Sequence, residues 1–293
     1  MEPVRMAQER LPELTDSLII QGDARVALRK LPDQSIQCCV TSPPYWSLRD
    51  YDMPGQIGLE PSVYQFINRL IEVFAEVRRV LRDDGVLWLN IGDAYTSGDR
   101  GYRAPDKKNP VRAMSYRPET PEGLKPKDLI GIPWRLALAL QQDGWYLRSD
   151  VIWEKPNCMP ESMKDRPTRA HEYLFLLTKS ERYYYDYRAV KERGRNRRTV
   201  WSINTQPFNG AHFATFPPAL VDPCIRAGSR VGDFVLDPFL GSGTVGLVCN
   251  QLDRKYVGIE LNPEYVKMAD KRLNEIGKQP QLMLVSGGDD GES

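Results

Sequence analysis

The segment that most constrains the fold is DFVLDPFLGSGTVGLVCNQLDRKYVGIELNPEYVKMADKRL, residues 233–273. It reads as a strand (234–236), a glycine-rich turn, a helix, a second strand (256–259) that is followed by Glu260, and a second helix. Two consecutive strands joined through a helix run parallel in one sheet, and the helix covers one face of that sheet. The segment therefore predicts an α/β fold built on a parallel sheet.

The rest of the chain continues this alternation. Further strands are predicted in SLIIQGD (17–23), SIQCCVTSPPY (35–45), VLWLNIGD (86–93) and YLRSDVIWEKP (146–156). Residues 61–81 form an amphipathic helix that we expect Asp84-Gly85 to stop, and residues 127–144 form another that Gly144 closes. We predict a mostly parallel sheet with helices on both faces.

The glycine-rich turn DPFLGSGT favours a ligand site. Gly241 and Gly243 let the backbone approach a ligand closely at the start of a helix, where free N–H groups lie. Glu260 follows the next strand, 23 positions after Asp237, where a carboxylate can bind two ribose hydroxyls. A GxG turn also occurs without any ligand. The chain has no GxxxxGK[ST] motif, so a nucleoside cofactor without a triphosphate is preferred.

The stretch CCVTSPPYWSLRDY, residues 38–51, is a second candidate site. Pro43 and Pro44 end the strand before them and hold Ser42 and Tyr45 in a nearly fixed geometry. A proline pair also marks ordinary loops. Here the hydroxyl of Ser42, the carbonyl of Pro43 and the flat rings of Tyr45 and Trp46 could grip a planar ring that carries an amine, which suggests a nucleobase.

Positive charge is concentrated in two segments, although the net charge of the 293 residues is only +1. Residues 100–127 hold eight Lys or Arg against three acids, and residues 188–198 hold six against one. Such segments are typical of loops that meet a phosphate backbone, and solvated loops without a partner are the alternative.

Composition excludes some classes of protein. The five cysteines form no CxxC pair and only two histidines could assist them, so we expect no metal site and no disulfide framework. No run of about 18 apolar residues occurs, and the charged N-terminus lacks the apolar region of a signal peptide. We therefore expect no membrane partner and a cytoplasmic location.

Three motifs in this order, TSPPY, DPFLGSGT and GIELNPEY, resemble those of the S-adenosylmethionine-dependent DNA amino-methyltransferases. The resemblance is to the permuted (beta) group, in which the catalytic tetrapeptide precedes the cofactor motif, and it covers roughly residues 18–273. It implies a Rossmann-like sheet with inserted target-recognition segments, S-adenosylmethionine as cofactor and double-stranded DNA as partner. A cognate restriction endonuclease that acts separately is a further partner that the resemblance suggests.

The resemblance also assigns residues to roles. The catalytic group would be Ser42, Pro43, Pro44 and Tyr45. The cofactor site would comprise Asp23, Asp237, Pro238, Phe239, Gly241, Gly243, Thr244 and Glu260, with His212 and Phe216 from a less closely matched motif. Within this set, Asp23 would accept the adenine amine, Glu260 would bind the ribose, and the residues of DPFLGSGT would hold the methionine end. From the basic segment, Arg195, Arg197 and Arg198 would contact DNA.

The motif SPPY resembles that of the branch of this family that methylates cytosine N4. In the branch that methylates adenine N6, an acidic residue stands in place of the serine. We therefore expect base flipping and direct methyl transfer to cytosine N4, with adenine N6 as the alternative. Cys224 in DPCIRAG could serve a ring-carbon methyltransferase, but its place in a predicted helix favours core packing. An RNA or protein methyltransferase and a catalytically dead DNA-binding protein remain less favoured alternatives.

These expectations divide the chain into six parts. Residues 15–95 form the catalytic half, 96–127 a basic inserted loop, and 128–187 the rest of the sheet with the start of target recognition. Residues 188–211 form a basic DNA-facing segment, 212–285 the cofactor-binding half, and 286–293 a disordered tail.

Overall fold

The computed structural model describes residues 10–96, 118–206, 216–275 and 281–284. In this part of the chain the strands are β1 (Leu18–Gln21), β2 (Ile36–Thr41), β3 (Leu81–Ile91), β4 (Tyr146–Glu154), β5 (His171–Thr178), β6 (Val200–Ser202), β7 (Phe234–Asp237), β8 (Lys255–Glu260) and β9 (Gln281–Leu284). The helices are α1 (Ala24–Leu28), α2 (Val63–Val80), α3 (Ile132–Gln142), α4 (Pro218–Gly228), α5 (Thr244–Gln251) and α6 (Pro263–Asn274). None of these helices is long and apolar enough to cross a membrane.

The described strands form one sheet in the order β6-β4-β5-β3-β2-β7-β8-β1-β9. β5 runs antiparallel to both of its neighbours, and all other pairs are parallel. The carboxyl ends of all the strands except β5 therefore share one edge, which we call the carboxyl edge. The strand β2, which leads into TSPPY, lies directly beside β7, which leads into DPFLGSGT.

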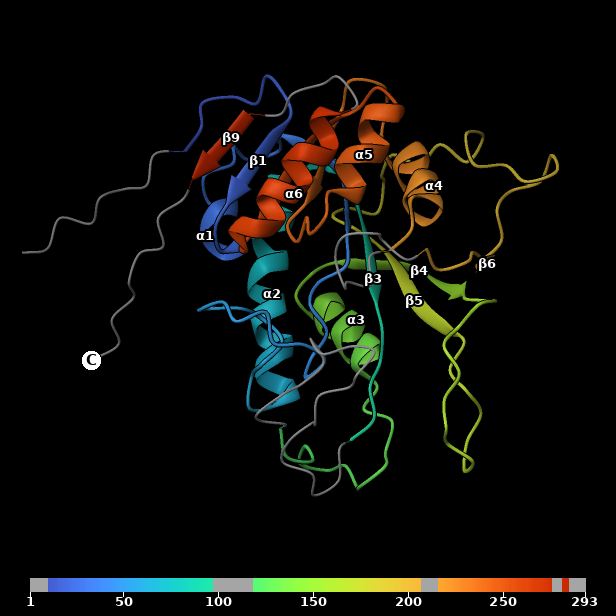
Figure 1. Cartoon of the computed structure of the whole chain (residues 1–293). Helices are drawn as coiled ribbons and strands as arrows, with labels where there is room; N and C mark the ends of the chain where they lie inside the picture. Colours follow the sequence, from blue (N-terminus) through green and yellow to red (C-terminus); the bar gives the residue numbers. More distant parts are fainter. Residues whose placement is uncertain (1–9, 97–117, 207–215, 276–280, 285–293) are drawn as a thin grey trace, which may run out of the picture.

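Helices cover both faces of the sheet, as Figure 1 shows. Successive strand residues alternate between two cores: Ile20 packs with the apolar faces of α1, α2 and α3, whereas Ile19 packs with those of α4, α5 and α6. The helix α2 supplies eight buried residues to the first core and begins at the N-cap Ser62, whose hydroxyl accepts a hydrogen bond from the backbone N–H of Gln65. The predicted α/β class with a mostly parallel sheet is confirmed.

Two helix boundaries were predicted wrongly. The helix expected over residues 127–144 begins only at Ile132, as α3. The helix α2 ends at Val80, where Leu81 turns to an extended conformation and starts β3 without a loop, so Asp84-Gly85 lies inside a strand. The pairing of β2 with β3 shifts register between Ile36 and Cys38, and the extra residues of β3 form a bulge there. A β-carbon on Gly85 would stand 2.9 Å from the carbonyl oxygen of Arg82, so the bulge itself accounts for this glycine. The elements α1, β5, β6 and β9 are additional to those predicted.

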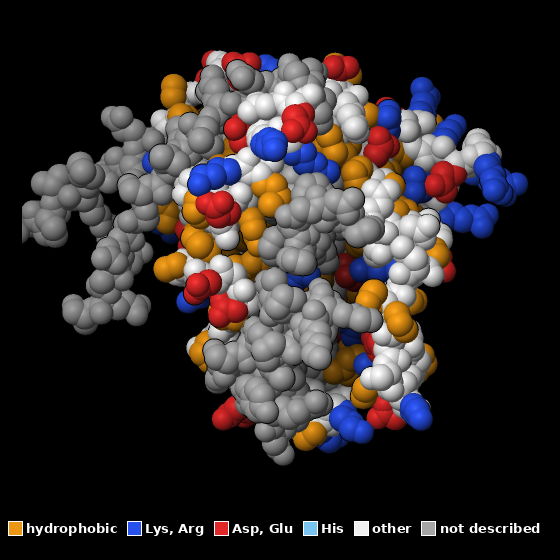
Figure 2. Space-filling model, in the orientation of Figure 1, with side chains coloured by type: hydrophobic (Ala, Val, Ile, Leu, Met, Phe, Trp, Pro, Cys, Tyr) orange, Lys and Arg blue, Asp and Glu red, His pale blue; other side chains and the backbone are white. Residues whose placement is uncertain are grey.

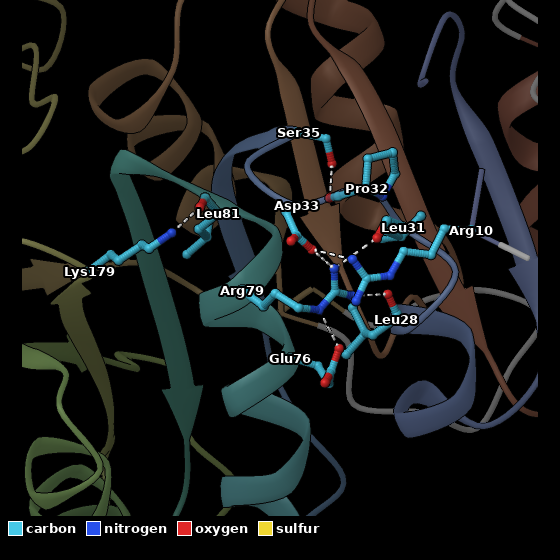
Figure 3. Close-up of polar contacts among 10 residues, drawn as sticks. All are labelled: Arg10, Leu28, Leu31, Pro32, Asp33, Ser35, Glu76, Arg79, Leu81 and Lys179. Atoms are coloured by element: carbon cyan, nitrogen blue, oxygen red, sulfur yellow. Dashed lines mark hydrogen bonds and ion pairs between the residues drawn. The ribbon is translucent and has the colours of Figure 1, made fainter. Parts of the chain in front are cut away.

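Arg79, in the last turn of α2, fastens the connection between α1 and β2 (Figure 3). Its guanidinium donates to the carbonyl oxygens of Leu28 at 2.8 Å and Leu31 at 2.9 Å, and it pairs with Asp33 and Glu76. The hydrogen bond from Arg79 holds the pKa of the Asp33 carboxyl below its ordinary value. Arg79 thereby fixes the chain just before β2, the strand that carries the tetrapeptide.

Replacing Arg79 by methionine should therefore lower the free energy of unfolding by about 2–4 kcal/mol, because two carbonyls lose charged donors that the apolar side chain cannot replace. Arg82→Met is the matched control, since Arg82 is half-exposed and makes one ion pair at 3.8 Å. That variant should lose less than about 1 kcal/mol. Urea unfolding measures both, and equal losses in the two variants would contradict the role given to Arg79.

Candidate active site

The tetrapeptide lies at the carboxyl edge, immediately after β2 and between β3 and β7. Pro43 is buried, whereas Ser42, Pro44 and Tyr45 are half-buried. The following loop folds back on this turn, because the backbone N–H of Ser47 donates to the carbonyl of Gly58 at 2.7 Å. The turn is thus held both by its prolines and by the loop behind it.

Tyr45 is anchored at its hydroxyl. The phenol donates a 2.7 Å hydrogen bond to Glu172 Oε2 at the start of β5, and Asn90 Oδ1 on β3 lies 3.4 Å away. Burial and the Glu172 charge raise the pKa of Tyr45 well above its ordinary value, although the nearby Ser42 hydroxyl opposes this shift. Tyr45 therefore stays a neutral donor to Glu172.

Trp46 differs from the flat, ligand-facing ring expected beside Tyr45. Its side chain is only 4% exposed and belongs to the core beneath α2. Its indole N–H donates to the carbonyl oxygen of Glu60 at 2.9 Å, so its polar atom is used inside the protein. The burial of Trp46 fixes the direction in which the chain leaves Tyr45.

A hydrogen bond joins TSPPY to DPFLGSGT, across a separation of 196 positions in the sequence. The hydroxyl of Thr41, the last residue of β2, donates to Asp237 Oδ1 at 2.7 Å, and the backbone N–H of Phe239 donates to the same oxygen at 3.1 Å. Asp237 is 1% exposed, and burial raises the pKa of its carboxyl from 3.8 to about 7. A cationic group beside this carboxylate would stabilise its charged form.

The pKa of Asp237 makes stability depend on pH. Between pH 4 and 7 the folded protein keeps a proton that the unfolded chain has released, so the contribution of Asp237 is full below about pH 4 and is lost as pH rises toward 7. Asp237→Asn does not titrate. Its free energy of unfolding relative to the unchanged protein should therefore rise by about 1.4 kcal/mol per pH unit between pH 5 and 7. Urea unfolding without cofactor measures this, and parallel pH curves would contradict it.

Glu260 ties together the two turns that follow β7 and β8. Its carboxylate accepts hydrogen bonds from the backbone N–H of Gly241 at 2.9 Å and of Asn262 at 2.8 Å. Burial raises the pKa of Glu260, and these N–H groups oppose the shift. A carboxylate has about four acceptor positions, so two remain for hydroxyl groups of a ligand. Gly241 and Gly243 both have positive φ, which the glycine-rich turn requires.

The remaining residues of the glycine-rich turn DPFLGSGT differ in their exposure to solvent. Pro238 and Thr244 are buried, whereas Phe239 is half-buried beside the turn. Gly243 is the N-cap of α5, and a β-carbon there would stand 3.2 Å from the side chains of Ala269 and Leu273 on α6. These residues shape the turn more than they line its surface.

Asp23 lies at the same edge, because β1 pairs with β8 and Gly22 donates to the carbonyl of Glu260 at 2.9 Å. Its carboxylate caps α1 and forms a salt bridge to Arg25 at 2.6 Å. Contact with an adenine amine thus stays a prediction for a carboxylate that already has partners. Phe216 packs against the core of α4–α6, and His212 lies outside the described residues.

Two tyrosines near Glu260 were not predicted as site residues. Tyr51 and Tyr265 meet edge to face at 6.3 Å between ring centroids, and burial, together with the Glu260 charge, raises the pKa of each. Arg49, only 8% exposed, forms a hydrogen bond with Tyr51. Tyr265 belongs to the motif GIELNPEY, so its position after Glu260 could have indicated it, whereas Tyr51 has no such signal.

A cavity of about 680 Å³ opens beside Tyr45. The segment 92–96 after β3 and the segment 118–132 form part of its wall, and the loop between β4 and β5 contributes charged side chains. Among these, Arg169 donates to the carbonyl of Asp93 and Arg166 lies 3.9 Å over the ring of Tyr95. A planar ring could enter this cavity against Tyr45. Most of the predicted basic loop 96–127 lies outside the described residues.

The three arginines predicted to bind DNA lie elsewhere. They precede β6, the outermost strand next to β4, which lies four strands away from β2 and the tetrapeptide. The segment before β6 extends from the body of the molecule at the right of Figure 1, and Figure 2 shows Lys and Arg side chains there. Arg195 and Arg198 are exposed, but Arg197 lies 4.2 Å over the ring of Trp201 and pairs with Glu192 at 3.1 Å. Only two of the three are free of such packing.

Cys224 lies inside α4, as predicted, and is completely buried. Its thiol donates to the carbonyl of Leu220 at 3.2 Å, and burial raises its pKa well above the ordinary value. A nucleophilic role for Cys224 therefore has no support. In the described part of the chain, no three His, Cys, Asp or Glu side chains are grouped as a metal site.

Comparison with known proteins agrees with this geometry. The sequence model of the N6/N4 DNA methylase family matches residues 36–271. The type II methyltransferase M.Cfr9I of Citrobacter freundii is 68% identical over 266 residues, which are 89% of each chain.

Two solved structures have the same fold. TTHA0409 of Thermus thermophilus, in complex with S-adenosyl-L-methionine, is 25% identical with a TM-score of 0.63 and covers 92% of this chain and 100% of its own. The cytosine-N4-specific PvuII DNA methyltransferase is 21% identical with a TM-score of 0.68, over 92% of this chain and 96% of its own, and this likeness concerns the fold alone. The extent of the family match and the identity to M.Cfr9I decide the assignment: the chain belongs to the N6/N4 DNA methylase family.

Proposed function

We propose that this protein is a type II DNA methyltransferase of a restriction–modification system, which uses S-adenosylmethionine to methylate cytosine N4 in duplex DNA. The observation that carries the proposal is the junction at the carboxyl edge. There the hydrogen bond between Thr41 and Asp237 places the turn of Ser42 and Tyr45 beside the glycine-rich turn. Membership of the DNA methylase family and the identity to M.Cfr9I support it.

The residues around Glu260 fit the proposed cofactor. Two acceptor positions of the Glu260 carboxylate are open to ribose hydroxyls, and the buried Asp237 is suited to a cationic amino group. The solved complex of TTHA0409 with S-adenosyl-L-methionine supports the same cofactor. When bound, S-adenosylmethionine supplies an activated methyl group.

Ser42 and Pro43 act on the base. An exocyclic amine is a poor nucleophile, because its lone pair is conjugated into the ring. The Ser42 hydroxyl and the Pro43 carbonyl can each accept one amine hydrogen, which favours a pyramidal nitrogen with its lone pair directed at the methyl group. A base can be reached in this way only when it leaves the duplex, and the cavity beside Tyr45 can receive a flipped base against the tyrosine ring.

Cytosine is favoured over adenine because Ser42, a neutral hydroxyl, occupies the position before PPY. The cytosine-N4 specificity of the PvuII enzyme belongs to a protein that shares the fold. Adenine N6 remains the second candidate, since it also presents two amine hydrogens to the same acceptors.

The decisive experiment treats unmethylated DNA with the purified protein and S-adenosylmethionine, digests it to nucleosides and analyses these by mass spectrometry. We expect N4-methylcytosine. N6-methyladenine alone would contradict the cytosine assignment, and no methylated nucleoside at all would contradict the enzyme activity. Sequencing of the modified positions in the same sample would give the recognition site.

DNA contact by the basic segment is a further prediction. Arg195 and Arg198 precede β6, which lies four strands away from β2, so any phosphates that they contact are distant from the target base. Replacing both by alanine should flatten the log–log salt dependence of binding to long duplexes by about two units. The slope on a short duplex that covers only the target site should not change. Arg226→Ala, at an exposed pair on α4, is the control, and an unchanged slope on long DNA would contradict the contact.

A further inference from the structure

A partly buried polar network surrounds the hydroxyl of Tyr45, and the reaction as described above leaves it unused. Its centre is Glu172, whose side chain is 16% exposed and which pairs with Lys155, also 16% exposed. Asn90 Nδ2 donates to Glu172 Oε2 at 3.2 Å and to the carbonyl of Tyr173 at 3.0 Å. The Lys155 ammonium also lies 4.1 Å over the ring of Trp153.

The network draws on three strands that converge only in the folded sheet. Asn90 lies on β3, Glu172 is the second residue of β5, and Lys155 follows β4 directly. A carboxylate and an ammonium that have lost most of their contact with water are costly unless each is well paired. The fold nevertheless keeps them here, with one oxygen of Glu172 directed at Tyr45.

The ring of Tyr45 is also held at its edge. A β-carbon on Gly92 would stand only 2.7 Å from Tyr45 Cε2 and 3.4 Å from the carboxyl carbon of Glu172, so Gly92 leaves the room that both side chains occupy. The ring also lines the 680 Å³ cavity. The hydroxyl is therefore fixed on the protein side while part of the ring remains open to a ligand.

We infer that Glu172 is a positioning residue that sets the orientation of Tyr45 as the stacking wall for the flipped base. This inference rests on the proposed function of Tyr45. It goes beyond that function because Glu172 does not touch the base. Glu172 binds the tyrosine hydroxyl, and Asn90 and Lys155 hold the Glu172 carboxylate in place.

The test uses Tyr45→Phe, Glu172→Gln and the double variant. Tyr45→Phe keeps the ring and the pair of Glu172 with Lys155, so it remains informative even if Glu172→Gln folds poorly. Tyr183→Phe and Glu181→Gln are the matched controls, because both lie after β5 at the opposite edge of the sheet. Each protein is compared by its melting temperature, its affinity for S-adenosylmethionine and its single-turnover methyl-transfer rate.

We expect each single variant to transfer the methyl group about tenfold more slowly, with an unchanged affinity for S-adenosylmethionine. The double variant should be no slower than the slower single variant, because the two changes remove one interaction. Multiplying losses would overturn the inference, since they would mean that Glu172 acts independently of Tyr45. A wild-type rate in either single variant would also overturn it.

A second measurement separates orientation of the ring from general support of the fold. Affinity is measured for a duplex with the target base opposite a mismatched partner, and for the same duplex with an abasic target. Tyr45→Phe and Glu172→Gln should weaken only the first complex, because an abasic duplex offers no base to stack. Equal weakening of both complexes would overturn the inference. Methyl transfer by the unchanged protein, measured first, tests the proposed function separately.

Discussion

Ser42→Ala should bind S-adenosylmethionine with unchanged affinity and transfer the methyl group about a hundredfold more slowly. The change removes an acceptor used at the reacting nitrogen and leaves the cofactor site around Glu260 intact, so the loss belongs to the transition state. The size follows from the sensitivity of such reactions to misplaced groups, which reaches about a hundredfold for about 1 Å. Single-turnover kinetics and calorimetry measure the two quantities.

Ser180→Ala is the control, because Ser180 follows β5 at the opposite edge of the sheet and uses its backbone carbonyl to contact Thr178. A fully active Ser42→Ala protein would contradict the mechanism. A parallel fall in cofactor affinity would instead place Ser42 in the cofactor site.

The second large effect concerns the cofactor itself. Glu260→Ala should weaken binding of S-adenosylmethionine by at least about 1.5–3 kcal/mol, the range for hydrogen bonds to a charged group. The structure adds a second reason for the loss, because the backbone N–H groups of Gly241 and Asn262 lose their acceptor and the glycine-rich turn loses its support.

Glu260→Gln separates the two causes. It keeps one oxygen for a backbone N–H but brings an amide that cannot accept from the second, so its loss should fall between those of the unchanged protein and Glu260→Ala. Glu264→Ala, at an exposed pair on the first turn of α6, is the control. Calorimetry on folded variants that finds unchanged affinity in Glu260→Ala would remove Glu260 from the cofactor site.

Local patterns in the sequence predict the elements that carry strong periodicity. The helix α2 and the elements from β7 to α6 could be predicted from the spacing of apolar residues and from the glycines at turns. Both patterns lie entirely within the segment that they describe. The helix α1 has five residues and β6 has three, so neither is long enough to show a period. Asp84-Gly85 resembles a helix stop, but its place in a bulge depends on the pairing of β3 with β2.

In the candidate site, too, the sequence identifies some residues, whereas only the folded structure shows their contacts. The motif residues Ser42, Asp237 and Glu260 could be identified because each stands at the end of a recognisable strand. The partner of Tyr45 could not be identified, since Glu172 is 127 positions away and reaches it only after the antiparallel strand β5 enters the sheet. The packing of Arg197 over Trp201 could not be predicted either, because only the folded segment shows which of the three arginines packs on an aromatic ring.

The position of β1 in the sheet has a consequence for synthesis of the chain. β1 pairs only with β8 and β9 among the described strands, and these begin at Lys255 and Gln281. A growing chain on the ribosome therefore carries residues 18–21 without a partner strand until residues 255–260 have been made. β1 can join the sheet only after that segment leaves the ribosome, so the nascent chain exposes an apolar strand while more than 200 further residues are synthesised.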